Sequence, residues 1–295
     1  MEAASRREFL ARAAVSVPLG VPITRAADRT TLVPGLLNGK VAVIYGAAGA
    51  MGGAVSRAFA RESAQVFLAG RTLKKLEALA DDIRNSGGFA RAAEVDALDR
   101  AAVNEHLAEV TRLHGGPDIS FNLIGLGGKQ GEPLTEMDPD TFAEPITTAM
   151  RTHYLTATAA ARHMAPRRTG VILALTAQVA RKPYAGSGGF GVACAAIEGL
   201  WRQLALELGP AGIRVITLRS SGSPDAPGVS VAIAEHARLA GVSREMFESR
   251  IAEKTMLKRM PLMDEIAGAA VLVASDRASA ITAAVTNVTC GELAD

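Results

Sequence analysis

The chain has 295 residues, a length that suits one α/β domain of about 250 residues with a short extension better than two domains. Its 32 Lys and Arg residues and 30 Asp and Glu residues give a formal charge of +2, and 48% of the chain is hydrophobic. This balance excludes a strongly basic nucleic-acid binder and a disordered chain of low hydrophobicity. We expect no membrane span, because no run approaches 18 uninterrupted apolar residues, and no metal site, because the two Cys and five His show no ligand spacing.

Residues 1–36 are expected to form an N-terminal extension. Within it, Ser5 to Leu10 (SRREFL) resembles a twin-arginine export signal, and a mildly apolar run follows it. The alternative is an amphipathic N-terminal helix, since Arg12 interrupts the approach to that run. The localisation therefore stays open between the cytoplasm and export through the twin-arginine route.

After the extension, short apolar runs alternate with longer stretches of helical periodicity. The predicted strands are Val41–Tyr45, Gln65–Ala69, Phe89–Val95, Ile119–Ile124, Gly170–Leu175, Ile213–Leu218 and Thr286–Thr289. The predicted helices are Gly52–Arg61, Leu73–Asn85, Arg100–Leu113, Pro139–Ala165, Gly191–Leu208 and Asp264–Ala274. Strict alternation and strands that are apolar on both faces predict an α/β fold: a single domain over residues 37–295 with a doubly wound, Rossmann-type parallel sheet.

A loop of small residues follows the first predicted strand and opens the first helix. It reads Gly46-Ala-Ala-Gly-Ala50-Met51-Gly52. Small residues let the backbone approach a pyrophosphate, and a helix N-terminus offers it free N–H groups and the positive end of a dipole. The alternative is a tight turn with close helix packing.

These residues resemble the short-chain dehydrogenase/reductase family over roughly residues 37–292. Gly46-x-x-x-Ala50-x-Gly52 is similar to that family's Gly-x-x-x-Gly-x-Gly loop, with Ala50 in place of the middle glycine. After the second strand, Arg71 stands beside a glycine where NAD-binding members carry an acidic residue. A guanidinium favours a ribose 2′-phosphate, so the resemblance implies NADP(H), although Arg71 could also be an ordinary solvated side chain.

Two further segments match the family's cofactor site. Asp96, expected to end the third strand, lies where the family contacts adenine. Asn122-Leu-Ile-Gly125 resembles the family's Asn-Asn-Ala-Gly segment after the fourth strand. The resemblance therefore implies Gly46, Ala50, Met51, Gly52, Arg71, Asp96, Asn122 and Gly125 as cofactor-binding residues.

The positions of the family's catalytic tetrad carry other residues. Phe190 and Cys194 stand where a Tyr and a Lys lie one helical turn apart, Ala177 stands at the Ser position and Ala149 at the Asn position. In the family, the Lys lowers the pKa of the phenol and holds the nicotinamide ribose. Neither Phe190 nor Cys194 can perform those functions.

Substitute proton donors are few. Thr176 has a hydroxyl but no adjacent base or cation, and Tyr184 lies in the loop before the helix, where a flexible surface tyrosine is the alternative. Cys194 could act as a nucleophile, although nothing next to it in the sequence lowers its pKa, and a buried thiol is the alternative. The catalytic residues are therefore unknown at this level.

Two hypotheses for function remain. The first is an NADP(H)-dependent reductase of an activated C=C or C=N bond, whose reaction needs little acid at oxygen; the second is a catalytically degenerate scaffold that binds NADP(H) and has a regulatory or other non-redox role. A mixed apolar and charged lid over about residues 222–260 favours an apolar, medium-sized small molecule as substrate. Apolar and small residues on the two long helices, which pack against symmetry mates in the family, predict a homodimer or homotetramer.

Overall fold

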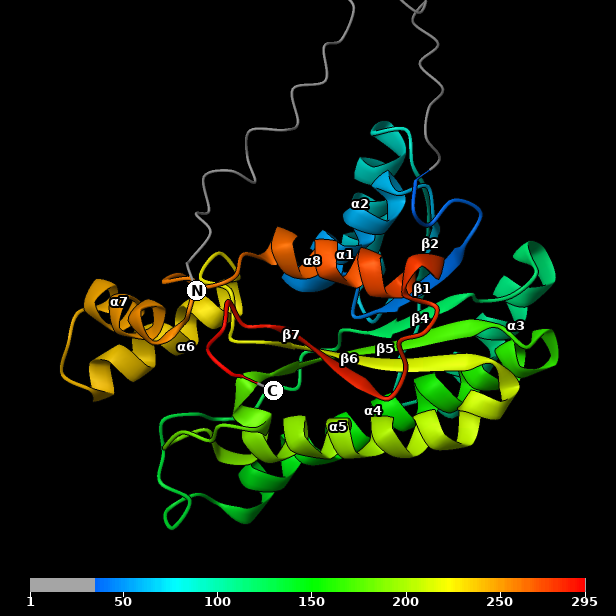
Figure 1. The fold of residues 1–295 in the computed structure, drawn as a ribbon. Helices are drawn as coiled ribbons and strands as arrows, with labels where there is room; N and C mark the ends of the chain where they lie inside the picture. The colour runs from blue at the N-terminus through cyan, green and yellow to red at the C-terminus, as the bar shows by residue number, and fades with distance from the viewer. Residues whose placement is uncertain (1–34, 295) are drawn as a thin grey trace, which may run out of the picture. The chain divides into compact units, whose positions relative to one another are not determined.

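The computed structural model describes residues 35–294, so the segment that resembles an export signal lies outside the described residues. Seven strands form one parallel sheet in the order β3-β2-β1-β4-β5-β6-β7 (Figure 1). The strands are β1 Val41–Tyr45, β2 Gln65–Gly70, β3 Phe89–Glu94, β4 Ile119–Asn122, β5 Gly170–Ala177, β6 Ile213–Ser220 and β7 Ala284–Val288. The order reverses between β1 and β4, which confirms the predicted doubly wound, Rossmann-type sheet.

Helices cover both faces of the sheet (Figure 1). One layer consists of α1 (Ala50–Arg61), α2 (Leu73–Asn85) and α8 (Met263–Ala274), and the other of α3 (Arg100–His114), α4 (Pro139–Met164) and α5 (Gly188–Leu208). Two separate apolar clusters fill the spaces between these layers and the sheet. Alanine is common in both clusters, so the helices approach the sheet closely and leave little room for larger side chains.

The predicted elements are all present, but several ends differ. The third strand ends at Glu94, so Asp96 lies beyond it rather than at its end. Helix α5 begins at Gly188, three residues earlier than predicted, because its first turn is made of glycines that carry no hydrophobic signal. Two helices were missed: α6 (Pro227–Leu239) and α7 (Arg244–Lys254) lie within the segment expected to be a lid.

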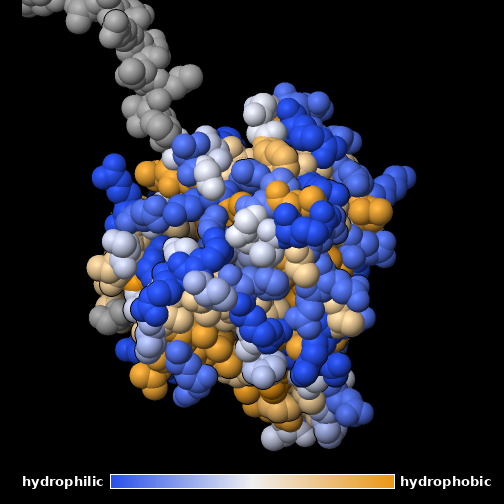
Figure 2. All heavy atoms as spheres, turned by 90° about the vertical axis from the view of Figure 1, so that its right-hand side faces the viewer, coloured by the Kyte–Doolittle hydropathy of each residue, from blue (hydrophilic) through white to orange (hydrophobic). Residues whose placement is uncertain are grey.

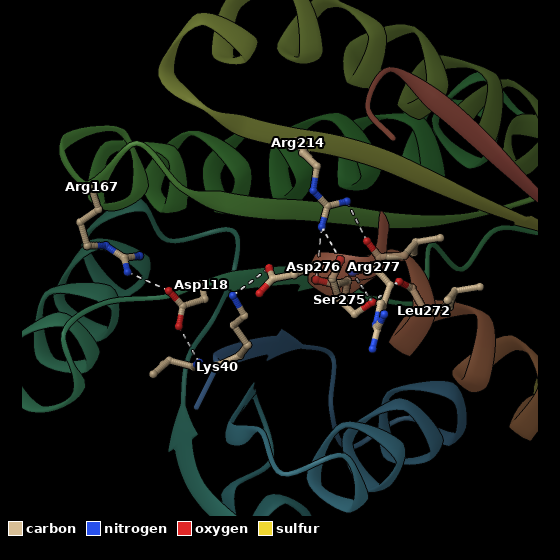
Figure 3. Close-up of polar contacts among 11 residues, drawn as sticks. Lys40, Asp118, Arg167, Arg214, Leu272, Ser275, Asp276 and Arg277 are labelled. Atoms are coloured by element: carbon tan, nitrogen blue, oxygen red, sulfur yellow. Dashed lines mark hydrogen bonds and ion pairs between the residues drawn. The ribbon is translucent and has the colours of Figure 1, made fainter. Parts of the chain in front are cut away.

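Polar contacts join the elements at the amino ends of the strands (Figure 3). Asp118, just before β4, accepts hydrogen bonds of 2.8 Å from the backbone N–H of Val41 and from Arg167. Lys40 forms an ion pair of 2.9 Å with Asp276, and Arg214 donates to backbone carbonyls at the end of α8. These contacts fix the connections at this edge, whereas ligands of such sheets bind at the opposite, carboxyl edge.

The face shown in Figure 2 interleaves hydrophilic and apolar residues in small groups. Over residues 35–294, no helix combines the length and the apolar character that a membrane span requires.

Candidate functional site

The loop between β1 and α1 has a backbone that only glycine permits at two positions. Gly46 has φ +76°, and a Cβ there would lie 2.7 Å from the carbonyl oxygen of Leu123. A Cβ on Gly52 would lie 2.3 Å from the carbonyl oxygen of Gly46. Ala50 is the first residue of α1 and is exposed, while Met51 is half-buried. The loop therefore folds back tightly and leaves the N-terminus of α1 open at the carboxyl edge of the sheet.

A cavity of about 320 Å³ lies beside this loop, and two basic residues are among those that line it. Its lining includes backbone of the loop and the side chains of Arg57 on α1 and Lys75 on α2. Arg57 is paired with Asp82 at 2.6 Å, but within the described part of the chain no carboxylate pairs with Lys75 or with Arg71. Arg71 is exposed and directly follows β2. Lys75 could not be predicted from the sequence, because a lysine on an amphipathic helix carries no signal of its own.

The remaining predicted cofactor residues follow β3 and β4. Asp96 is exposed, and its carboxylate accepts a hydrogen bond of 2.9 Å from the N–H of Leu98. Asn122 is buried at the end of β4, where its amide donates to Thr156 on α4 and its oxygen accepts from the N–H of Ile124. Gly125, three residues later, is exposed with open space around its Cα. The four strand ends β1 to β4 thus bring all the predicted cofactor residues to one edge.

A second group of predicted residues gathers at the ends of β5 and α5. Phe190 and Cys194 lie one turn apart near the start of α5, and Ala177 ends β5. Burial raises the pKa of the Cys194 thiol to about 12, although its contact with the backbone of Ala177 acts in the opposite direction. Ala149 on α4 is fully buried. The thiol therefore stays protonated at neutral pH, which does not suit a nucleophile.

One turn beyond Cys194, a buried ion pair occupies the same face of α5. Glu198 accepts two hydrogen bonds from the guanidinium of Arg219 on β6, at 2.8 and 2.7 Å. Thr176 donates its hydroxyl to the same carboxylate at 3.0 Å. Both charged side chains are about 5% exposed. Thr176 therefore hydrogen-bonds to a structural ion pair. The pair of Glu198 and Arg219 could not be predicted from the sequence, because no motif links residues 198 and 219.

Tyr184 lies in the connection between β5 and α5. Its hydroxyl donates to Oε1 of Gln130 at 3.2 Å, and His236 on α6 contacts the same oxygen at 3.2 Å. The Tyr184 and His236 rings meet edge to face, with centroids 5.4 Å apart. Burial raises the pKa of Tyr184 to about 12, and the nearby Cys194 and Glu292 add to the shift. Tyr184 therefore links the connection between β5 and α5 to α6 of the lid segment, residues 222–260.

Two neighbouring residues of α4 differ in exposure. His153 is buried against Trp201 on α5, with ring centroids 4.9 Å apart, while Tyr154 is 50% exposed. Burial lowers the pKa of His153 to about 3, so its ring is neutral. Over residues 35–294 no group of three or more His, Cys, Asp or Glu side chains is placed to hold a metal ion.

Comparison with known proteins supplies the family. A family model described as "Enoyl-(Acyl carrier protein) reductase" matches residues 46–292. The chain belongs to the short-chain dehydrogenase/reductase family. Among individual relatives of this family, the oxidoreductase YxbG of Bacillus subtilis is 29% identical over 255 residues, which cover 84% of this chain and 89% of that protein.

Solved structures of short-chain dehydrogenases share the fold. Sorbitol-6-phosphate 2-dehydrogenase SrlD from Erwinia amylovora superposes with a TM-score of 0.81 at 24% identity, covering 86% of this chain and all of that one. A gluconate 5-dehydrogenase from Burkholderia cenocepacia, solved with NADP and tartrate, gives 0.77 at 23% identity, covering 87% and 96%. At these identities the likeness shows only that the fold is shared, and the chemistry of this chain must be inferred from its own residues.

Proposed function

We propose that this member of the short-chain dehydrogenase/reductase family is an NADP(H)-dependent reductase of an activated C=C or C=N bond. One observation carries the proposal: the loop after β1 leaves the start of α1 open beside a cavity lined by Arg57 and Lys75, while Phe190, Cys194 and Ala177 stand at the positions that the resemblance assigns to the family's proton-handling groups. Such a site can bind the cofactor but lacks the usual acid for a ketone oxygen.

The residues at the cofactor edge fit a dinucleotide phosphate. Gly46 and Gly52 keep the backbone clear of side chains at the start of α1, where free N–H groups suit a pyrophosphate. Lys75 lines the cavity beside the same loop and Arg71 directly follows β2. Neither has a carboxylate partner among the described residues, and their positive charge suits a 2′-phosphate rather than a free hydroxyl. The gluconate 5-dehydrogenase solved with NADP supports the same cofactor for this fold. When bound, the cofactor supplies a hydride.

The environment of Cys194 favours substrates that need little help from an acid. Reduction of a ketone creates negative charge on oxygen, and general acid catalysis there contributes about 10²–10⁴ in rate. A protonated C=N bond, by contrast, becomes neutral on accepting hydride, and a polarised C=C bond spreads the charge. The phenyl ring has no acidic proton, and the thiol of Cys194 carries no positive charge to stabilise an oxyanion, so these two bond types suit the site better.

We propose an isologous homodimer or homotetramer built through the layer of α4 and α5. Tyr154 on α4 is 50% exposed, and a hollow of about 560 Å³ beside it extends to α3.

Consumption of NADPH tests the proposed function. The protein, first titrated with NADPH and NADH to measure both dissociation constants, is mixed with panels of cyclic imines, enones and ketones. We expect tighter binding of NADPH and turnover of imines or enones, with ketones slower by at least 10²-fold. Tight NADPH binding without turnover of any panel would favour the non-redox scaffold, and absence of NADPH binding would overturn both.

A further inference from the structure

A carboxylate with a free oxygen is buried at the end of the chain. The side chain of Glu292, four residues after β7, is only 9% exposed. One oxygen, Oε1, lies 3.6 Å from Nζ of Lys182. The other, Oε2, is buried and has no hydrogen-bond partner among the described residues. A buried acceptor left without a donor costs free energy, which a hydrogen bond from water or from a ligand would recover.

Three segments hold Glu292 in place. Its own N–H donates to the carbonyl of Thr289 at 3.1 Å, and Met256 and Leu257, just after α7, donate to the carbonyls of Gly291 and Cys290. Lys182 approaches from the connection between β5 and α5. The carboxylate therefore lies between the base of the lid segment and the loop that leads to Cys194, and its position is fixed by backbone contacts.

Glu292 also lies within electrostatic reach of the residues around Cys194. Burial is the main cause of the raised pKa of Tyr184, but both Cys194 and Glu292 contribute to it. Lys182, whose ammonium lies 3.6 Å from Glu292, belongs to the connection that leads from β5 into α5, the helix that carries Phe190 and Cys194.

We propose that Glu292 is a substrate-binding residue whose free oxygen accepts a hydrogen bond from the protonated nitrogen of a C=N substrate. The proposal rests on the reductase function above and narrows its substrate class from C=C or C=N to iminium ions. A carboxylate accepts hydrogen bonds and cannot donate them when ionised, so it favours an N–H cation over the carbonyl oxygen of an enone.

The reaction balances without a proton from the protein. The hydride that NADPH supplies forms a C–H bond at the iminium carbon, and the π electrons of the C=N bond become the lone pair of an amine nitrogen. NADPH is oxidised to NADP⁺ and the iminium is reduced to an amine, which takes up a proton from water. Glu292 holds the nitrogen throughout, and this explains how the site can function with Phe190 and Cys194 in place of a Tyr and a Lys.

Substitution of Glu292 tests this in the full-length protein. Glu292→Gln keeps the size of the side chain and removes its charge, and Glu105→Gln, on the exposed face of α3, is the matched control. With saturating NADPH, we expect Glu292→Gln to lower kcat/KM for protonated methylpyrroline by about 10- to 100-fold, the effect of one charge-assisted hydrogen bond, and to change it less than twofold for cyclopentenone. Glu105→Gln should change neither value.

Binding of the product cation gives a readout that needs no turnover. Methylpyrrolidinium, titrated calorimetrically into protein without cofactor, should bind the Glu292→Gln variant about 10- to 100-fold more weakly than the parent. If that variant fails to fold, Lys182→Met leaves the carboxylate without its ammonium partner and should bind methylpyrrolidinium at least as tightly as the parent.

Several results would overturn the assignment of Glu292: equal losses on methylpyrroline and cyclopentenone, no loss on methylpyrroline, or weaker binding of methylpyrrolidinium by Lys182→Met. If the parent reduces cyclopentenone but not methylpyrroline, the proposed reductase function is supported and the proposed binding of iminium substrates by Glu292 is wrong. If the parent binds no NADPH, the reductase function falls on its own evidence, whatever the amine titration gives.

Discussion

Removing the charge of Glu198 should destabilise the fold strongly. In Glu198→Gln the guanidinium of Arg219 stays buried but loses its bidentate carboxylate, and Thr176 loses a charged acceptor. Breaking a buried pair in this way costs about 3–5 kcal/mol, because the remaining charge cannot return to water. At about 2–4 °C per kcal/mol for a domain of this size, Tm should fall by roughly 6–20 °C.

Urea denaturation of matched variants measures this effect. Asp82→Asn breaks the ion pair with Arg57, whose two side chains are about half exposed, and should cost only about 0–1 kcal/mol. In the double variant Glu198→Gln with Arg219→Met, the loss should be smaller than the sum of the two single losses, since both substitutions remove the same ion pair. A loss below about 1 kcal/mol for Glu198→Gln, or additive single losses, would refute the reasoning.

Other expectations concern the cofactor, the catalytic positions, pH and assembly. Arg71→Asp should reverse the preference for NADP⁺ over NAD⁺ in a binding titration, and equal affinities in the parent would contradict the cofactor assignment. The triple variant Phe190→Tyr, Cys194→Lys and Ala177→Ser should gain NADPH-dependent reduction of a small diketone over the parent; a folded, NADPH-binding variant without any gain would show that the pocket has changed beyond these positions. Burial lowers the pKa of His153 to about 3, so below about pH 6.5 the unfolded chain binds a proton at this residue that the folded chain does not. The contribution of neutral His153 to stability is therefore full at neutral pH and decreases as pH falls. His153→Phe should remove about 2 kcal/mol of the stability lost between pH 7 and 5 in urea titrations, and an unchanged pH dependence would refute this. Light scattering at micromolar concentration should show a dimer or tetramer, and a monomer would count against the interface proposed on α4 and α5.

Most of the fold could be predicted from the sequence because its signals are local. The alternation of apolar runs and helical periodicity marked every strand, and Gly46 and Gly52 marked the loop whose geometry excludes a Cβ. The ends of elements were less certain, since the glycines that open α5 have no hydropathy. Helices α6 and α7 were missed because their periodicity is weak: over α7 no residue is buried.

Only the residues of the site that belong to local sequence motifs could be predicted. The resemblance to the family's motifs named the residues at the ends of β1 to β4, Arg71 after β2 among them, and the sheet order brings these strand ends to one edge. The pair of Glu198 and Arg219, and the carboxylate of Glu292 beside Lys182, join residues that are 21 and 110 positions apart. Such contacts depend on packing between distant elements, and no spacing in the sequence encodes them.

Transfer of deuterium tests the central claim most directly. The protein is loaded with NADPH that carries deuterium at the hydride-donating carbon, mixed once with protonated methylpyrroline or cyclopentenone, and the product is analysed by mass spectrometry. We predict one deuterium on the carbon that accepts the hydride, in an amine or a saturated ketone, and none from an ordinary ketone at a comparable rate. Deuterium in an alcohol formed from a ketone at about 1–10³ s⁻¹, or a protein that binds NADPH and transfers no deuterium at all, would contradict the account.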